Sequence, residues 1–194
     1  MTRLVGVSGT HGCGKTTFIN DVSEKYGYAY SSEHLSRELQ EEQGWSDLTP
    51  VTKSFDTMRW FQGELLVRMC ARDKFVDRSL DYCMMDRTPI DLAAYTMLWY
   101  EHFNIPSDAW LNEYKNFYFE SIKENYYSIF ILNKLESFVA EQHRASSKTQ
   151  SRCEALIKGL VSEYKGSEYA GVSCIDILTL DRYNRVTELN GNLT

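Results

Sequence analysis

The stretch "GTHGCGKTT", from Gly9 to Thr17, decides the fold. It satisfies the pattern G-x-x-x-x-G-K-[ST], in which glycines let successive backbone N–H groups turn inward around phosphate oxygens. The apolar run Leu4–Ser8 precedes it, and the segment that follows places Phe18, Val22 and Tyr26 on one helical face. A strand, a glycine-rich turn and a helix in this order predict a phosphate-binding loop at the positive end of the helix.

Individual positions of this loop have distinct predicted roles. We expect the Lys15 ammonium to reach the β- and γ-phosphates, and the Thr16 hydroxyl to bind Mg²⁺. The pattern therefore predicts a nucleoside triphosphate with Mg²⁺ as the bound group. The residues expected to hold the nucleotide are Gly9, Thr10, His11, Gly12, Cys13, Gly14, Lys15, Thr16 and Thr17.

A second motif begins with an acidic residue, Asp86, directly after the apolar run "YCMM". A Mg²⁺-bound triphosphate needs a carboxylate near the metal, and Asp86 is the best candidate, with Asp176 as a later rival. Arg87 comes next and is suited to neutralise a phosphate. Asp91 has two interpretations, because it stands three residues after Thr88, where a capping-box acid belongs, but it is also near the predicted substrate.

Length, charge and cysteine content limit the number of domains, the class of partner and the location that the sequence predicts. The chain has 194 residues, 43% of them hydrophobic, which predicts one domain over residues 1–194. A net charge of −6 gives no global attraction for nucleic acid or anionic lipid. The five cysteines have no metal-ligand spacing, and no apolar run is long enough for a membrane span. We expect a cytoplasmic, reducing location and no membrane partner, and the oligomeric state stays open.

Short apolar runs alternate with helical periodicity along the chain. The expected strands are 4–8, 28–32, 81–85, 127–132 and 172–177, and apolar faces predict helices around residues 90–98 and 153–164. This alternation is typical of an α/β protein with a parallel, helix-covered sheet. Thr88 and Ser107 are the predicted N-caps of two of the helices.

The chain resembles the P-loop kinases of the nucleoside and nucleotide monophosphate kinase type. The resemblance rests on "GTHGCGKTT", "MMDRTPID", "WFQ" and "EQHRASSKTQ". It is closest to the branch with ribosylnicotinamide kinase domains and several phage kinases, where D-R-[ST]-x-x-D precedes an Ala-Tyr pair, here Ala94 and Tyr95. It implies a three-layer P-loop NTPase fold, a five-stranded parallel sheet in order 2-3-1-4-5, and a helical lid at about 133–152. It also implies ATP and Mg²⁺ as cofactors.

The same resemblance implies roles for residues outside the loop. Arg144 and Arg152 match lid arginines, Glu33 matches a catalytic base, and Gln62 matches a residue that reads the base. Arg37 is a further candidate for substrate binding. Each has a structural alternative: Glu33 fits the first turn of a helix, Gln62 fits a helix surface, and the lid arginines fit a solvated face.

The predicted function is transfer of the γ-phosphate of ATP to a nucleoside or nucleotide acceptor. A small-molecule substrate is favoured. Alternatives are ribosylnicotinamide kinase and a kinase that phosphorylates a hydroxymethylated pyrimidine in DNA, for which Arg68, Arg72, Lys74 and Arg78 would form a basic strip. A GTPase ranks lower, because "NKLE" at 133–136 ends in Glu rather than the Asp of N-K-x-D.

Overall fold

The central element of the computed structural model is a sheet of five strands in the order β2-β3-β1-β4-β5, and every pairing is parallel. The structure describes residues 3–31, 34–76, 81–133, 147–177 and 182–193. The expected strand order is confirmed, and all five expected strands are present. Their bounds are β1 Arg3–Gly9, β2 Ala29–Ser31, β3 Tyr82–Asp86, β4 Tyr126–Leu132 and β5 Ser173–Ile177.

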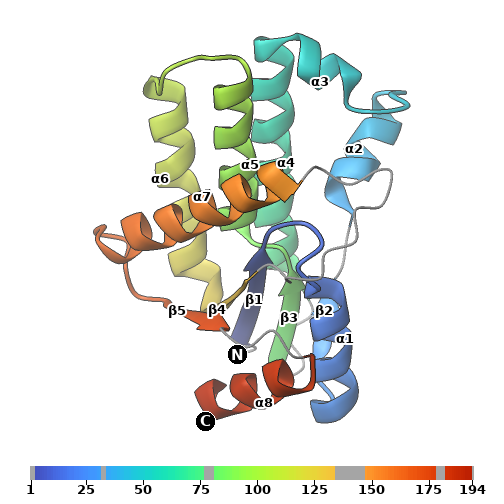
Figure 1. The fold of residues 1–194 in the computed structure, drawn as a ribbon, viewed down its shortest axis with the longest axis vertical. Coiled ribbons are helices and arrows are strands. Elements are labelled where there is room, and N and C mark those ends of the chain that lie inside the picture. The colour runs from blue at the N-terminus through green and yellow to red at the C-terminus, as the bar shows by residue number, and fades with distance from the viewer. Residues whose placement is uncertain (1–2, 32–33, 77–80, 134–146, 178–181, 194) are drawn as a thin grey trace.

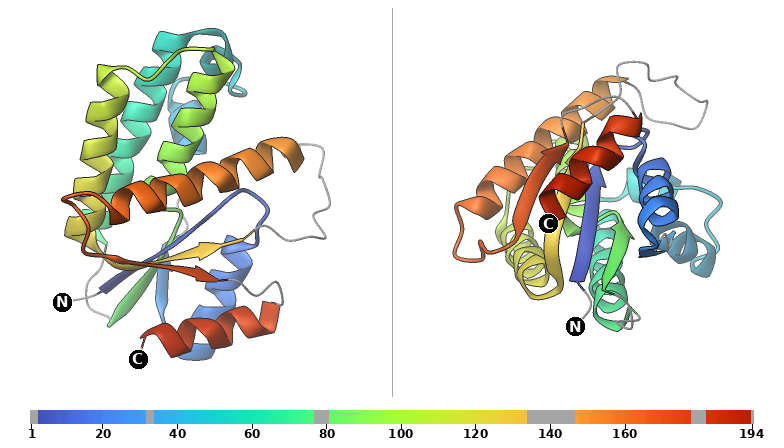
Figure 2. Two further views of the ribbon diagram at one scale, coloured as in Figure 1. Left: turned by 60° about the vertical axis from the view of Figure 1, so that its left-hand side comes forward. Right: turned by 90° about the horizontal axis from the view of Figure 1, so that it is seen from below.

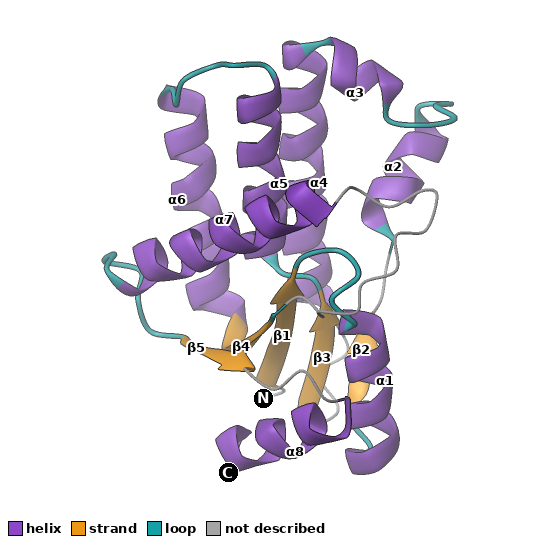
Figure 3. Cartoon of the chain, in the orientation of Figure 1, coloured by secondary structure: helices purple, strands orange, loops and turns teal. Residues whose placement is uncertain are grey.

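Helices cover both faces of this sheet and make three layers. One face carries α1 and α8, and the other carries α4, α5, α6 and α7 (Figures 2 and 3). The two helices expected from periodicity correspond to α5 and α7. The bounds are α1 Lys15–Tyr26, α2 Leu35–Glu42, α3 Thr49–Lys53, α4 Phe55–Phe75, α5 Pro89–His102, α6 Ala109–Asn125, α7 Ser147–Lys165 and α8 Arg182–Leu193.

Two hydrophobic cores lie on opposite faces of the sheet, because successive side chains of a strand point to opposite sides. Val5 and Val7 of β1 pack in the core under α1 and α8, whereas Leu4 packs in the larger core under α4 to α7. Burial on both faces explains why β1, β3 and β4 are mostly apolar in the sequence, whereas β2 and β5 at the edges of the sheet are partly exposed.

Helix ends agree with the predicted caps at one position and differ at another. Thr88 caps α5 and forms a capping box with Asp91, as the sequence predicted. The prediction that Ser107 caps the next helix is wrong, because α6 begins at Ala109 and the Asp108 carboxylate accepts the Leu111 N–H at 3.0 Å. An ionised carboxylate is the stronger acceptor at the positive end of a helix.

The loop after β1 and the turn after β3 lie at the same edge of the sheet, because parallel strands end together. In Figure 1 the helices α4, α5 and α6 extend past this carboxyl edge, with α2 and α3 beside α4. Residues 147–152 of the expected lid form the first turns of α7, and residues 134–146 lie outside the described part. None of the described helices is long and apolar enough to span a bilayer.

Candidate active site

The loop between β1 and α1 has the backbone that the glycines of its motif were expected to permit. Gly9 has φ 151°, and a Cβ there would lie 2.7 Å from both the Cys13 sulfur and the Leu132 carbonyl oxygen. Gly14 has φ 89° and is the N-cap of α1. Both positions therefore require glycine, and the amino end of α1 closes the loop, where backbone N–H groups favour an anion.

The Lys15 side chain folds back across the loop. Its ammonium donates to the carbonyl oxygens of Gly9 and Thr10, and lies 3.9 Å from the Asp91 carboxylate. The side chain is only 8% exposed. Lys15 is thus held at the loop by backbone acceptors that a phosphate can replace.

Thr16 and Asp86 come together from two different elements. The Thr16 hydroxyl on α1 donates to Asp86 Oδ2 at 2.8 Å, across 70 residues of sequence. The other carboxylate oxygen, Asp86 Oδ1, is buried and has no hydrogen-bond partner. A hydroxyl and an orphaned carboxylate oxygen are hard ligands that fit Mg²⁺, which keeps its remaining places for water and phosphate.

No cluster of three or more His, Cys, Asp or Glu side chains suited to a metal occurs among the described residues. The Thr16 and Asp86 oxygens fit Mg²⁺ carried by a nucleotide, because such an ion requires only one or two protein oxygens.

The turn after β3 places Arg87 beside this pair. Arg87 has φ 69°, a left-handed conformation that is unfavourable for any residue with a Cβ, and its N–H donates to the Val7 carbonyl at 3.1 Å. Its side chain is exposed. The backbone is thus fixed while the guanidinium is accessible at the carboxyl edge of the sheet.

The Asp91 carboxylate is buried, and both of its oxygens accept hydrogen bonds from backbone N–H groups. One carboxylate oxygen accepts the Gly9 N–H and the other accepts the Thr88 N–H, both at 2.9 Å. The capping interpretation is confirmed, and the carboxylate also joins the phosphate loop to α5. Contact between Asp91 and a substrate stays a prediction.

The outer side of the loop is tied to three helices. The His11 ring nitrogen Nδ1 is 3.0 Å from the Tyr95 hydroxyl on α5, and the Gln150 amide on α7 donates to the His11 carbonyl at 2.9 Å. Arg185 on α8 donates to the Cys13 carbonyl at 2.7 Å. Burial raises the pKa of the Cys13 thiol, so Cys13 packs as a neutral group.

The remaining predicted site residues that the structure describes lie on helices α2, α4 and α7 rather than in the loop after β1. Gln62 on α4 is 3% exposed and accepts a hydrogen bond from the Thr96 hydroxyl at 3.2 Å, so the helix-surface alternative is wrong. Arg37 is exposed on α2. Arg152 on α7 pairs with Glu101, and its contact with ATP stays a prediction. Glu33 and Arg144 lie outside the described residues.

The described part of the predicted basic strip is not assembled. Arg68 is paired with Glu42 and Glu64, whereas Arg72 is buried against Asp73. Lys74 alone is exposed, and Arg78 lies outside the described residues. Neighbouring acids neutralise two of these cations. The strip therefore gives no support to a DNA substrate.

The sequence did not indicate the residues that support the loop and the turn through hydrogen bonds, and it assigned Arg72 to the basic strip instead. These residues are Arg72, Asp73, Tyr126, Gln150 and Arg185. Arg72 donates to the carbonyl oxygens of Asp86 and Arg87, and Tyr126 donates to Asp73. The one available signal was the adjacent Arg-Asp pair near the end of a helix, a pattern that is usually exposed.

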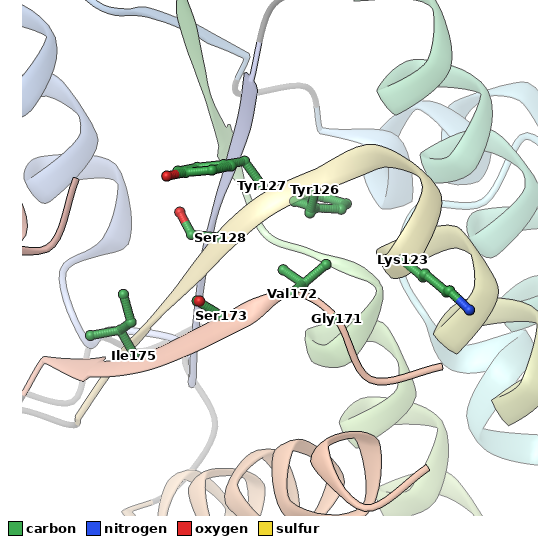
Figure 4. A pocket seen from close by; sticks show the side chains of 8 residues that line it. All are labelled: Lys123, Tyr126, Tyr127, Ser128, Gly171, Val172, Ser173 and Ile175. Atoms are coloured by element: carbon green, nitrogen blue, oxygen red, sulfur yellow. The ribbon is translucent and has the colours of Figure 1, made fainter. Parts of the chain in front are cut away.

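A pocket of about 300 Å³ lies at the opposite, amino edge of the sheet (Figure 4). It is lined by the starts of β4 and β5, including Ser128 and Ser173, and by Lys123 at the end of α6. The loop after β1 takes no part in it. This pocket is therefore separate from the phosphate loop.

Comparison with known proteins identifies a family and several solved structures with a similar fold. A family model described as an AAA domain matches residues 4–178. No protein with a curated description matches the sequence. The chain is similar in fold to a deoxyadenosine kinase from M. mycoides with dCMP and dCDP bound, with a TM-score of 0.66, 16% identity, and coverage of 98% of this chain and 97% of that one.

Two further solved structures have the same fold. The M. mycoides deoxyadenosine kinase with bound dATP has a TM-score of 0.60 and 23% identity, and each chain is 98% covered. A NadR protein in complex with NAD and AMP-PNP has a TM-score of 0.66 and 14% identity. The alignment covers 98% of this chain but only 50% of the NadR chain, so this chain matches half of that protein.

Proposed function

The chain belongs to the AAA domain family, and from this membership and the site geometry we propose that it transfers the γ-phosphate of ATP to the hydroxyl of a nucleoside. The fold is that of nucleoside kinases, which supports phosphoryl transfer to this class of acceptor. The ATP analogue AMP-PNP in the NadR structure further supports ATP as the donor.

One observation carries the proposal: the Thr16 hydroxyl and the Asp86 carboxylate meet beside the phosphate loop, and one Asp86 oxygen is buried without a partner. A buried unpaired carboxylate oxygen is costly, and a cation carried by a nucleotide would relieve that cost. A merely structural Thr–Asp contact would not require a left-handed glycine loop and a lysine beside it.

The proposed chemistry depends on position and charge. The loop N–H groups and Lys15 would hold the triphosphate, while Thr16 and Asp86 would hold the Mg²⁺. Bound Mg²⁺ would neutralise charge on the transferring phosphate. Arg87 would stabilise the same charge from the exposed side of the turn. We also propose, on the resemblance, that Arg144 and Arg152 close over the nucleotide.

The acceptor would lie near α4 and α5. Gln62 uses its carbonyl oxygen to accept from Thr96, which leaves the amide N–H₂ as a donor for a base. The predicted general base is Glu33, which would accept the proton of the attacking hydroxyl. Arg37 remains a candidate for an anionic group of the substrate.

Ribosylnicotinamide is a second candidate acceptor, because a NadR structure in complex with NR has a TM-score of 0.68 to this chain. A GTPase is disfavoured. The Asn133 side chain of "NKLE" donates to the Ile177 carbonyl at 3.1 Å, so its amide is engaged in tying the ends of β4 and β5 together.

The test is an ADP-release assay with MgATP and a panel of acceptors: deoxyribonucleosides, nucleoside monophosphates, ribosylnicotinamide and DNA containing hydroxymethylated pyrimidines. We expect turnover with deoxyribonucleosides or ribosylnicotinamide, and a loss of about 10²-fold in Thr16→Val. Acceptor-independent hydrolysis, or phosphorylation of the DNA alone, would contradict the proposal.

A further inference from the structure

Two adjacent charged residues near the end of α4 are buried in the protein. The Arg72 and Asp73 side chains are 4% and 0% exposed, and their charged groups are 2.7 Å apart. The Tyr126 hydroxyl at the start of β4 donates to the second Asp73 oxygen at 2.6 Å. Burying an ion pair carries a desolvation cost, so its retention calls for an explanation beyond stability.

The Arg72 guanidinium also reaches the turn after β3. It donates to the Asp86 carbonyl at 3.3 Å and to the Arg87 carbonyl at 3.2 Å. Only a planar group with several fixed N–H donors can hold the Asp73 carboxylate on one side and two consecutive carbonyls on the other. These contacts connect α4 to the backbone of both site residues.

That turn is strained and needs support. Arg87 holds a left-handed conformation, and its N–H is fixed by the Val7 carbonyl. Gly6 of β1 makes room beneath the turn, because a Cβ there would clash with Thr88 and lie 3.0 Å from the Tyr126 ring. The buried pair, the tyrosine and the turn thus form one packed unit on this face of the sheet.

We propose that Arg72 is a positioning residue for phosphoryl transfer. It holds the Asp86–Arg87 turn so that the Asp86 carboxylate faces Thr16 and the Arg87 guanidinium stays at the phosphate side. This inference rests on the proposed function, because it assigns Asp86 to Mg²⁺. Asp73 and Tyr126 act through Arg72 by fixing its guanidinium plane.

The test compares ATP affinity with and without Mg²⁺, measured by calorimetry in the absence of any acceptor. Arg72→Lys keeps the charge but loses the planar set of donors. We expect it to weaken ATP binding in the presence of Mg²⁺ by about 10-fold or more, the usual effect of losing a group that orients a metal ligand. Binding without Mg²⁺ should change by less than about 2-fold, because the loop N–H groups are untouched.

Arg68→Lys is the matched control, since Arg68 lies one turn earlier on α4 and pairs with Glu42 at the surface. It should match the wild type under both conditions. If Arg72→Lys does not fold, Tyr126→Phe takes its place, because it removes a single hydroxyl and should shift Mg²⁺ dependence in the same direction.

The possible outcomes separate the two claims. An unchanged Mg²⁺ dependence in a folded Arg72→Lys or Tyr126→Phe variant, or an equal loss with and without Mg²⁺, overturns the positioning role and leaves the proposed function intact. Failure of the wild type to bind MgATP overturns both.

Discussion

The two edges of the central sheet differ in how their polar groups are held. At the carboxyl edge, Asp91, Lys15 and Arg72 are buried and bonded to backbone groups of the loop or of the turn. At the amino edge, the Ser128 hydroxyl is buried without a partner, and Lys123 is exposed. The charged groups named at the carboxyl edge are therefore fixed by backbone partners, whereas the Lys123 ammonium is at the surface, and fixed charge is what electrostatic catalysis requires.

The largest expected contrast is between two lysines. Lys15→Met should lower phosphoryl transfer by about 10³-fold or more, because it removes the cation at the phosphate loop. Lys123→Met, at the amino edge, should leave the rate within about 2-fold, because a surface charge far from the loop is screened. Steady-state ADP release measures both, and circular dichroism melts check that both variants are folded. Equal phosphoryl-transfer rates for the two variants would contradict a catalytic role that is confined to the carboxyl edge.

Two aspartates within the carboxyl edge sharpen the comparison. Asp91→Asn replaces an oxygen that accepts a backbone N–H, so we expect it to lower the free energy of unfolding by about 2 kcal/mol. Asp86→Asn should change stability by less than about 1 kcal/mol, because one of its oxygens has no partner, yet lower the rate by about 10²-fold.

Urea denaturation and ADP release measure the two effects separately. The reverse pattern, with stability lost at Asp86 and retained at Asp91, would contradict the roles assigned to the two carboxylates.

A smaller effect tests the strain in the turn. Arg87→Gly should be more stable than Arg87→Ala by about 1 kcal/mol, because glycine adopts φ 69° without the Cβ penalty. Both variants lose the guanidinium, so we expect similarly low rates of phosphoryl transfer for the two. Thermal melts of the two proteins decide the point, and an alanine variant as stable as the glycine variant would mean that the turn relaxes.

The smallest effect is expected at the amino edge. Ser128→Ala removes a buried hydroxyl with no hydrogen-bond partner, and should stabilise the protein by up to about 1 kcal/mol without changing the rate. Urea denaturation measures the change. A clear loss of stability would indicate that the pocket in Figure 4 supplies the hydroxyl with a partner.

The sequence predicted those parts of the site that are local in the chain. Gly9 to Thr17 and Asp86 to Asp91 are short segments whose spacing reflects backbone requirements, so the loop, the capping box and the contact between Thr16 and Asp86 could be anticipated. The strand order followed from the family resemblance, and the strand positions followed from continuous apolar runs.

The supporting contacts could not be predicted, because they depend on packing between distant segments. Tyr126 meets Asp73 across 53 residues, and Arg185 meets the Cys13 carbonyl across 172 residues. Arg72 and Arg68 lie four residues apart on the same helix. Arg72 is nevertheless buried, whereas Arg68 forms ion pairs at the surface. Helical spacing alone does not separate such residues until the neighbouring elements are placed.

The most direct test of the account is a crystal structure of the chain with Mg²⁺ and a non-hydrolysable ATP analogue. We expect the triphosphate inside the loop from Gly9 to Thr17, with Lys15 turned from the Gly9 carbonyl to the phosphates and Mg²⁺ beside Thr16 and Asp86. A nucleotide bound elsewhere, with Lys15 still bonded to the loop carbonyls, would contradict the account.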